Sequence, residues 1–456
     1  MAGSDQGGRK LNYIIIFAQA FEEFRIPELE SLDKLFNLGI DFSNLQIDIY
    51  CPYMILKLDG DDQARQLGSR AISIKHILRH WANATSYEEL HQMNRQNRHL
   101  WDMHVTCHSF KITITSYKST ISQDKKQSLI QSLSYMDFKG PIDLIKPDVE
   151  IFLSEEFHNQ ELTQSAGSER VRSTKNLSLK MIWLGHKICD GQRSLIDRFD
   201  LKKRVYIGNT SMDAGLSLLM ANQGLVSADS FVNDPFTGTG SILYACAWFG
   251  AQVFGSDIDG RPMRGRDGFS IRDSAKQYGV YEKFIDCAVF DMTQNPWRVE
   301  QIFDAIICDP PYGVRAGAKK LGRKDLSKLR SEPYVLQDGT YSHQKSDYIP
   351  PSKPWEMSEV LDELLKFSHR MLKIGGRLVY WLPTVTEDYS GSDIPLLDGM
   401  RVVSNSCQDF GKWQRRLITM ERVMESKEEK QGSESEKTST LTGHHGFRDR
   451  YMTGFS

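Results

Sequence analysis

The residues with the most specific chemical meaning form the tetrapeptide Asp309-Pro310-Pro311-Tyr312. Proline has a fixed φ and no backbone N–H donor, so this motif presents carbonyl oxygens and one carboxylate as hydrogen-bond acceptors. An exocyclic amino group of a base has the matching N–H donors, and Tyr312 can stack on the plane of an extruded base. Acceptors placed in this way orient the nitrogen lone pair toward a methyl donor and remove charge as the bond forms. The motif therefore predicts methyl transfer to an amino group, and the alternative is a Pro-Pro sequence that only ends a strand.

A second group of residues is typical of a nucleoside-binding site. Asp234 begins a loop with Gly238 and Gly240, where the backbone can approach a ligand at a helix N-terminus. This loop lacks the third glycine of a dinucleotide fingerprint and the Gly-Lys-Ser/Thr of a phosphate-binding loop. Asp257 ends the next predicted strand, where it can accept both ribose hydroxyls, and Asp291 follows the third, where it can meet an adenine amino group. Each acid alone is an ordinary strand-end residue, but together they predict a nucleoside site.

The elements that must position these residues begin at about Asp200, where strands alternate with helices as in a doubly wound parallel sheet. Helices are predicted at Ser241–Phe249 and Glu356–Met371, with a Gly375–Gly376 turn into the last strand. The predicted strands are Ser230–Asp234, Gln252–Asp257, Ile285–Phe290, Ala305–Cys308 and Gly376–Leu382. Because parallel strands place their carboxyl ends at one edge, the acids and the Asp-Pro-Pro-Tyr motif should meet there.

The N-terminal part has a different order of elements. A β-branched run at Tyr13–Ala18 precedes a helix after Pro27, and Ala71–Trp81 fits either a strand or a helix. Further strands are predicted at Leu45–Tyr50 and Tyr53–Leu58, with a short helix near Asp62–Gly68. With Ala71–Trp81 as a strand, the order is βαββαβ, which is the ferredoxin-like arrangement.

A second α+β module is predicted from about Tyr87 to Cys189. Its strand Phe110–Ser116 alternates apolar and polar residues, and a helix is expected over about Gln123–Met136. Two more strands are predicted at Val149–Leu153 and Leu179–Ile188. Lys, Thr and His on the outward strand faces are compatible with contact to RNA but do not require it.

The charge of the chain is near neutral overall, at −2, but it is unevenly distributed. Between Arg315 and Arg330, seven basic side chains face one acidic side chain, directly after the Asp-Pro-Pro-Tyr motif. A basic cluster of this kind predicts contact with phosphate, although ordinary solvated surface is the alternative. Within the loop of about Gly317–Pro354 and just before it, the candidate RNA-binding residues are Arg315, Lys319, Lys320, Arg323 and Lys324.

Several classes of protein are disfavoured by composition. The longest apolar run, Ile242–Ala251, is too short to span a bilayer, which needs about 18–20 such residues. The seven cysteines are scattered without a CxxC pair, which favours reduced thiols in the cytoplasm or nucleus and argues against zinc fingers. His76 and His80 share a face whether their segment is helix or strand, but no Cys or carboxylate completes a ligand set, so no metal site is predicted. The polar segment from about Glu425 onward is expected to be disordered.

These motifs resemble those of the Rossmann-like, S-adenosylmethionine-dependent amino methyltransferases, whose mark is (Asp/Asn/Ser)-Pro-Pro-(Tyr/Phe). Arg204–Met212 together with Met220–Asn222 is similar to the lead-in of methyltransferases that follow a THUMP RNA-binding domain. Asp309–Arg323 and Trp413–Glu421 are similar to the eukaryotic and archaeal tRNA guanine-N2 methyltransferases that act at guanosine 10.

The resemblance covers nearly the whole chain and implies its domain organisation. We expect an α/β protein in which a ferredoxin-like domain and a THUMP domain precede a Rossmann-like class I methyltransferase domain. The implied boundaries are a ferredoxin-like domain at 1–85, a THUMP domain at 86–190, a linker at 191–202, a methyltransferase domain at 203–424 and a disordered tail at 425–456.

The resemblance also implies roles for single residues. Asp234, Gly238 and Gly240 would contact the methionyl part of S-adenosylmethionine, Asp257 the ribose and Asp291 the adenine. Thr210 would lie near the same pocket, while Asp309, Pro310, Pro311 and Tyr312 would receive the guanine. A small zinc-containing activator subunit is implied as a partner, and a strand such as Phe284–Phe290 would provide an edge for it.

Two other functions remain open at this point. An adenine-N6 or other amino methyltransferase shares the Asp-Pro-Pro-Tyr logic, although the THUMP-like region argues against it. A catalytically idle RNA-binding scaffold is the other alternative, and the intact set of acids and glycines argues against that one.

Overall fold

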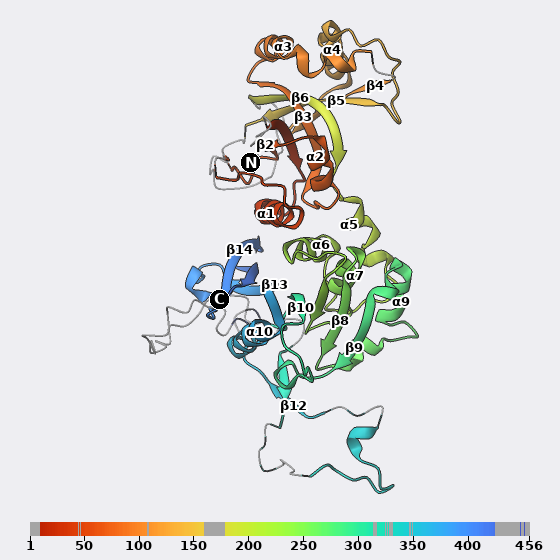
Figure 1. Ribbon diagram of the computed structural model, residues 1–456, viewed down its shortest axis with the longest axis vertical. Coiled ribbons are helices and arrows are strands. Elements are labelled where there is room, and N and C mark those ends of the chain that lie inside the picture. The colour runs from red at the N-terminus through yellow and green to blue at the C-terminus, as the bar shows by residue number, and fades with distance from the viewer. Residues whose placement is uncertain are drawn as a thin grey trace, which may run out of the picture. The chain divides into compact units, whose positions relative to one another are not determined.

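The computed structural model describes residues 10–43, 45, 47–106, 109–158, 178–312, 317–323, 325, 327, 332–345, 348, 350–424, 447 and 451 (Figure 1). The chain divides into two compact units by its internal contacts. The first unit comprises Met1–Arg25 and Phe36–Arg193, and the second comprises Ile26–Leu35 and Ser194–Ser456.

The first unit is built on a single six-stranded sheet with the order β2-β1-β3-β6-β5-β4. Its strands are β1 (Leu11–Phe17), β2 (Tyr53–Leu58), β3 (Ile74–Ala84), β4 (Phe110–Tyr117), β5 (Val149–Phe157) and β6 (Leu179–Asp190). The α-helices that lie wholly in this unit, among the described residues, are α2 (Asp61–Gly68), α3 (Tyr87–Gln96) and α4 (Gln123–Ser132). Strand β3 pairs with β1 on one side and with β6 on the other. One continuous sheet therefore contains strands from before and after residue 85, where the ferredoxin-like domain was expected to end.

The N-terminal predictions are mostly confirmed, with one error. The ambiguous segment Ala71–Trp81 contains most of strand β3, and its buried Trp81 packs with Leu90 of α3 in the core of this unit. The strand predicted at Leu45–Tyr50 is wrong, because the described residues there form turns. The Asp48 carboxylate accepts a hydrogen bond from the Tyr50 backbone N–H at 3.0 Å, and such a local bond competes with strand pairing. The order of elements through β3 is therefore βαβαβ.

The second unit contains a seven-stranded sheet with the order β14-β15-β13-β10-β7-β8-β9. The strands are β7 (Phe231–Asp234), β8 (Gln252–Asp257), β9 (Phe284–Val289), β10 (Phe303–Cys308), β13 (Leu372–Val385), β14 (Met400–Asp409) and β15 (Trp413–Arg422). All pairs from β9 to β13 are parallel, whereas β15 runs antiparallel to both β13 and β14. The five strands predicted for this sheet are therefore confirmed, and the predicted Rossmann-like class I fold with them.

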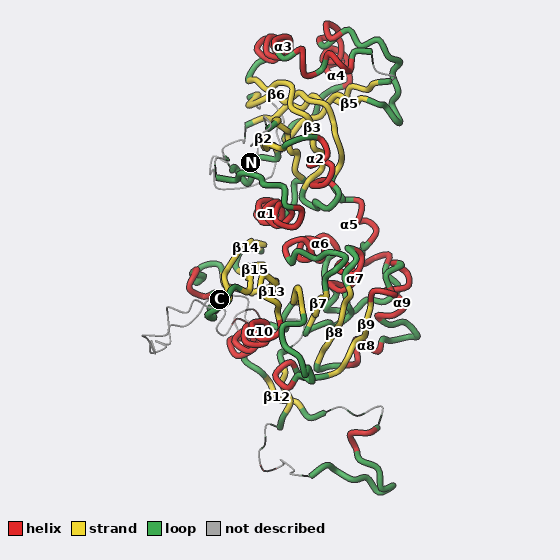
Figure 2. The backbone as a smooth tube through the Cα atoms, viewed as in Figure 1, coloured by secondary structure: helices red, strands yellow, loops and turns green. Residues whose placement is uncertain are grey.

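Helices flank this sheet, and strand and helix alternate along the chain (Figure 2). They are α5 (Ser194–Arg198), α6 (Ala214–Gln223), α7 (Ser241–Trp248), α8 (Gly260–Arg264), α9 (Ile271–Tyr278) and α10 (Met357–Met371). Helix α10 forms because Val360, Leu361, Leu364 and Leu365 recur at helical spacing and pack against the sheet. Among the described residues, no helix combines the length and apolar character needed to cross a bilayer.

One helix of the N-terminal sequence belongs to the second unit. Residues Ile26–Leu35 of α1 (Arg25–Phe36) are counted with that unit, and buried polar contacts explain why. The Glu28 carboxylate accepts a hydrogen bond from the Asn222 amide at 2.7 Å, and both side chains are fully buried. The buried Arg377 guanidinium donates to the Ser31 hydroxyl at 3.0 Å. Sequence periodicity predicted this helix but not its location.

Candidate active site

Four acidic residues lie where strands of the second unit end. Asp234 and Asp257 are the last residues of β7 and β8, while Asp291 and Asp309 follow β9 and β10. The order of strands reverses between β7 and β10, which are neighbours in the sheet although β8 and β9 separate them in the chain. Ligands of open α/β sheets bind at the carboxyl edge beside such a reversal. The structure thus brings the predicted acids to one edge.

The glycine loop after β7 is held by its own hydrogen bonds. Asp234 accepts the Phe236 backbone N–H at 2.9 Å, and its backbone oxygen accepts the Thr237 hydroxyl at 2.8 Å. Gly238 and Gly240 have φ values of +52° and +80°, a region that side chains other than glycine rarely enter. These bonds turn the chain tightly between β7 and the first residue of α7.

Thr210 lies against this loop, although it comes from a segment before α6. A Cβ atom added at Gly238 would stand 3.1 Å from the Thr210 Oγ1 atom, so the two residues are direct neighbours. In the same way, a Cβ atom at Gly208 would stand 2.9 Å from Cγ2 of Thr239. The segment of Gly208 and Thr210 therefore packs directly against the glycine loop.

Asp257 joins the glycine loop to the second strand. Its Oδ2 atom accepts the Gly238 N–H and its Oδ1 atom accepts the Asp259 N–H, both at 2.9 Å. The Ile258 backbone N–H also interacts with this carboxylate, and its remaining lone-pair capacity is open to a further donor. Burial raises the pKa of Asp257 to about 6, despite these hydrogen bonds. The geometry therefore fits a ligand with two adjacent hydroxyl donors.

Three carboxyl groups of this edge influence one another electrostatically. Burial raises the pKa of Asp234 well above its usual value, and the nearby charges of Asp257 and Asp309 raise it further. The same Asp309 charge, after burial and Asp234, contributes to the raised pKa of the Cys308 thiol. A site that gathers acids in this way favours a ligand with positive charge, such as an ammonium or sulfonium group.

Asp291 follows β9 and lies almost fully buried, with 3% of its surface exposed. Its Oδ1 atom accepts the N–H and the hydroxyl of Thr293 at 2.9 Å and 2.8 Å, and its Oδ2 atom accepts the Leu321 N–H at 2.7 Å. The carboxylate thus connects the sheet edge to the segment after the Asp-Pro-Pro-Tyr motif. Oδ2 keeps one lone pair for a further N–H donor, which an adenine amino group would supply.

The Asp-Pro-Pro-Tyr motif leaves the sheet at the end of β10, whose last residue, Cys308, pairs in register with Tyr380 of β13. Pro310 is buried, and Asp309 and Tyr312 are partly buried. The Tyr312 ring lies 6.2 Å from the ring of Phe447, measured between centroids. The sequence analysis did not identify Phe447, because this residue lies in the segment that was predicted to be a disordered tail. The spacing of the aromatic residues Phe447 and Tyr451, four positions apart, could have indicated an ordered segment.

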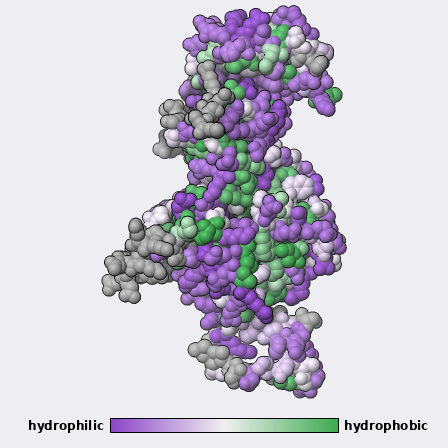
Figure 3. Space-filling model, viewed as in Figure 1, coloured by the Kyte–Doolittle hydropathy of each residue, from purple (hydrophilic) through white to green (hydrophobic). Residues whose placement is uncertain are grey.

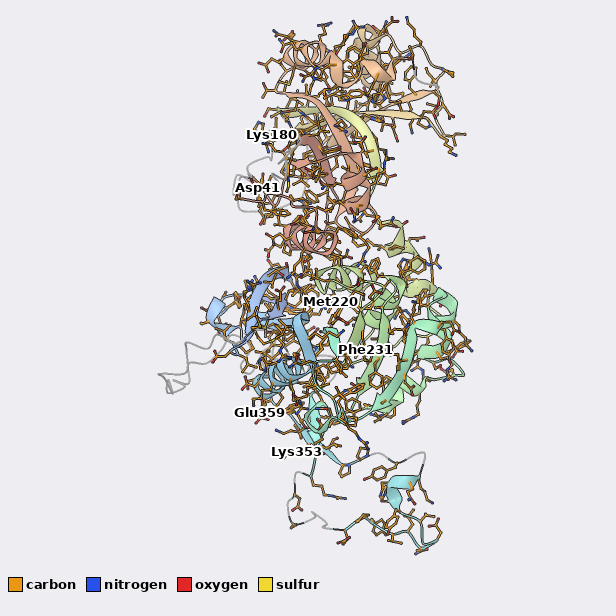
Figure 4. The ribbon with its side chains drawn as sticks, viewed as in Figure 1. Asp41, Lys180, Met220, Phe231, Lys353 and Glu359 are labelled. Carbon is orange, nitrogen blue, oxygen red and sulfur yellow. The ribbon has the colours of Figure 1, made fainter. Side chains whose placement is uncertain are left out.

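The basic candidates are placed only in part. Lys319 lies on β11 (Lys319–Leu321), which pairs with β12 (Ser352–Pro354), and both Lys319 and Arg323 are exposed. Lys320 forms an ion pair with Glu359 of α10 at 2.6 Å; Glu359 and Lys353 of β12 lie at the same end of the second unit in Figure 4. The other two candidates, Arg315 and Lys324, lie outside the described residues.

Metal binding has no counterpart in the part of the chain that the structure describes, because no three His, Cys, Asp or Glu residues gather there in a ligand arrangement. His76 instead pairs with Asp190 at 2.5 Å, and His80 with the Asn83 side chain at 2.8 Å. Burial lowers the pKa of both imidazoles within the sheet of the first unit.

Comparison with known proteins agrees with this geometry. Residues 11–193 match the family described as the Tmrp11 THUMP N-terminal domain, and residues 202–331 match the RMKL-like methyltransferase domain. The tRNA (guanine(10)-N(2))-methyltransferase of Saccharomyces cerevisiae is 35% identical over 97% of this chain and 99% of its own length. The human enzyme of the same name is 36% identical over 97% of this chain and 95% of its own. The chain belongs to the family of tRNA (guanine-N2)-methyltransferases, with a THUMP N-terminal domain and a class I methyltransferase domain.

Proposed function

We propose that this protein transfers a methyl group from S-adenosylmethionine to the exocyclic N2 atom of guanosine 10 in tRNA, in the cytoplasm. The observation that carries the proposal is the meeting of Asp234, Asp257 and Asp309 at the sheet edge, where the Asp-Pro-Pro-Tyr motif also begins. The relatives named for guanosine 10 support the choice of acceptor. The scattered cysteines favour a reducing compartment.

The glycine loop and its neighbours are the proposed cofactor site. Asp234, Gly238 and Gly240 hold the methionyl part, with Thr210 beside the loop, and Asp257 accepts the ribose hydroxyls while it keeps its bond to Gly238. Asp291 accepts the adenine amino group through the lone pair of Oδ2 that Leu321 does not use. The cofactor supplies an electrophilic methyl group on a sulfonium, a cation for which the surrounding acids are suited.

The Asp-Pro-Pro-Tyr motif is the proposed acceptor site. Asp309 and the carbonyl oxygens beside Pro310 and Pro311 accept the N–H groups of guanine N2, which fixes the direction of its lone pair. Tyr312 stacks on the base, and the Asp309 carboxylate favours the positive charge that develops on N2 before its proton leaves. In this scheme Asp309 orients and stabilises, and the site needs no strong general base.

The exposed basic residues after the motif are proposed to bind the tRNA backbone. Lys319 and Arg323 are exposed and follow the motif in the sequence, as do the candidates Arg315, Lys320 and Lys324. Neutralising Lys319, Lys320, Arg323 and Lys324 removes up to four phosphate contacts and flattens the slope of log Kd against log salt. Binding that is unchanged at two salt concentrations would refute this clamp.

The edge of the sheet at β9 is the proposed docking site of a small zinc-containing activator subunit. Strand β9 is the last in the sheet order and pairs only with β8 among the described strands. Its Ile285 and Val289 are 54% and 47% exposed, and hydrophobic residues gather over the β8–β9 side in Figure 3. An open edge with exposed apolar side chains suits the addition of a partner strand.

One experiment separates the proposed function from its alternatives. The protein, with and without the candidate activator, is incubated with labelled S-adenosylmethionine and unmodified tRNA, and the modified nucleoside is identified after digestion. N2-methylguanosine that disappears in Asp309→Ala supports the proposal. Methyladenine would instead indicate an adenine methyltransferase, and tRNA binding without any methylated product would indicate a scaffold.

A further inference from the structure

An aromatic cluster adjoins the acceptor site and includes residues from the C-terminal end of the chain. We use the name aromatic cluster for Tyr312, Phe410, Trp413, Phe447 and Tyr451. The Phe447 ring lies 6.2 Å from Tyr312, 5.8 Å from Trp413 and 6.1 Å from Tyr451, between centroids. Trp413 in turn stacks on Phe410 at 4.3 Å and meets Tyr451 at 5.7 Å.

The position of Trp413 in the sheet explains why this cluster forms at the active-site edge. Trp413 begins β15 and pairs with Val385, the last residue of β13. Because β13 is parallel to β10, its end lies at the same edge as the motif that follows Cys308. Trp413 is therefore fixed by the sheet at the rim from which Tyr312 extends.

Phe447 is the buried centre of the cluster. Only 3% of its surface is exposed, whereas Phe410 is 46% exposed. Phe447 and Tyr451 stand four residues apart in the chain, and both of their rings contact Trp413. A buried aromatic ring that contacts Trp413 on the sheet rim and Tyr451 on its own segment is suited to hold a third ring, Tyr312, in one orientation.

The angle between the Tyr312 and Phe447 rings indicates whether Phe447 positions Tyr312 or blocks the face on which a base would stack. Tyr312 and Phe447 meet edge to face, with an interplanar angle of 77°. Such a contact uses at most one face of the Tyr312 ring, and a base needs only one face for stacking. We propose that Phe447 is a positioning residue: supported by Trp413 and Tyr451, it fixes the Tyr312 ring so that this ring stacks on the extruded guanine. This inference rests on the proposed function.

A double-mutant cycle on the full chain with its activator tests this coupling. The variants are Phe447→Leu, Tyr312→Ala and the double variant. Phe447→Leu keeps most of the side-chain volume but loses the ring. Leu396→Ala is the control, because it removes an apolar side chain that is 75% exposed. The readouts are the single-turnover methylation rate at saturating tRNA and the Kd of S-adenosylhomocysteine. We expect Phe447→Leu to lower the rate at least tenfold and leave the Kd within twofold. The double variant should be no slower than Tyr312→Ala, because Phe447 acts through Tyr312.

The outcomes distinguish this inference from the proposed function. A Phe447→Leu rate equal to that of Leu396→Ala overturns the positioning role, as do additive losses in the double variant. A rate above wild type also overturns it, in favour of a blocking role for Phe447. If wild type methylates a base other than guanine, the proposed function fails, yet the cycle still measures the coupling between Phe447 and Tyr312.

Discussion

Cofactor affinity should depend on pH through the ionisation of Asp257. Burial raises the pKa of this carboxyl to about 6, and its ionised form is the one that accepts hydrogen bonds from the ribose hydroxyls. Lowering the pH from about 7.5 to about 5 reduces the ionised fraction roughly tenfold, so the Kd should rise about tenfold, or about 1.4 kcal/mol. Asp234 acts in the same direction, because its pKa is also raised by burial.

Isothermal titration calorimetry with S-adenosylhomocysteine between pH 5 and pH 8 measures this dependence. Asp259 remains ionised over the range, because its bond to Arg261 lowers its pKa, so it does not contribute. The variant Asp257→Asn cannot titrate and should bind more weakly by about 1.5–3 kcal/mol with a flatter pH profile. Folding raises this pKa, so acidification below pH 6 stabilises the cofactor-free fold while it weakens binding.

The pH profiles of cofactor affinity for the wild type and for Asp257→Asn together test the role of Asp257. Affinity that is constant between pH 5 and pH 8, or that increases on acidification, would refute the role given to Asp257. An Asp257→Asn variant that keeps the full wild-type pH dependence would show that other groups cause it.

Three further changes should have separate effects. Gly238→Ala places a Cβ atom 3.1 Å from the Thr210 hydroxyl at a φ of +52°, so calorimetry should show a cofactor Kd at least tenfold higher and a melting temperature lower by a few degrees. Arg377→Met removes bonds to Ser31 and the Gln223 carbonyl, while Glu421 keeps Lys34 and Arg401, so the free energy of unfolding should fall by about 1–3 kcal/mol in urea titrations, and an unchanged midpoint would contradict the buried network. Ile285→Asp, near the start of β9 and away from Asp257, should prevent co-purification of the activator and leave cofactor affinity unchanged, and a retained complex would exclude this edge.

The sequence predicted the parallel sheet well because its strands are short apolar runs followed by acids or glycines. The bounds of β8 agree with the prediction, and Asp257 lies at the strand end where it was expected. Local pattern failed at Leu45–Tyr50, where the residue types suit a strand but the Asp48 carboxylate bonds to the nearby Tyr50 backbone. A side-chain bond over two residues changes no hydropathy pattern, so periodicity does not detect it.

Contacts between residues far apart in the chain could not be predicted from local sequence patterns. The bond between Glu28 and Asn222 joins residues 194 positions apart, and neither residue type predicts its partner. Phe447 likewise follows a long polar segment, so its composition suggested a tail, although the ring is buried beside Tyr312. Such contacts depend on the tertiary fold, which places Asn222 on α6 and Trp413 at the start of β15.

The most direct test of the account concerns the acceptor atom. Two tRNA transcripts are compared, one with guanosine and one with inosine at position 10, which differ only in the N2 amino group. With labelled S-adenosylmethionine and the activator present, we expect methyl transfer to the guanosine transcript alone. Equal incorporation into both transcripts would contradict it, because the methyl group would then reside on another atom.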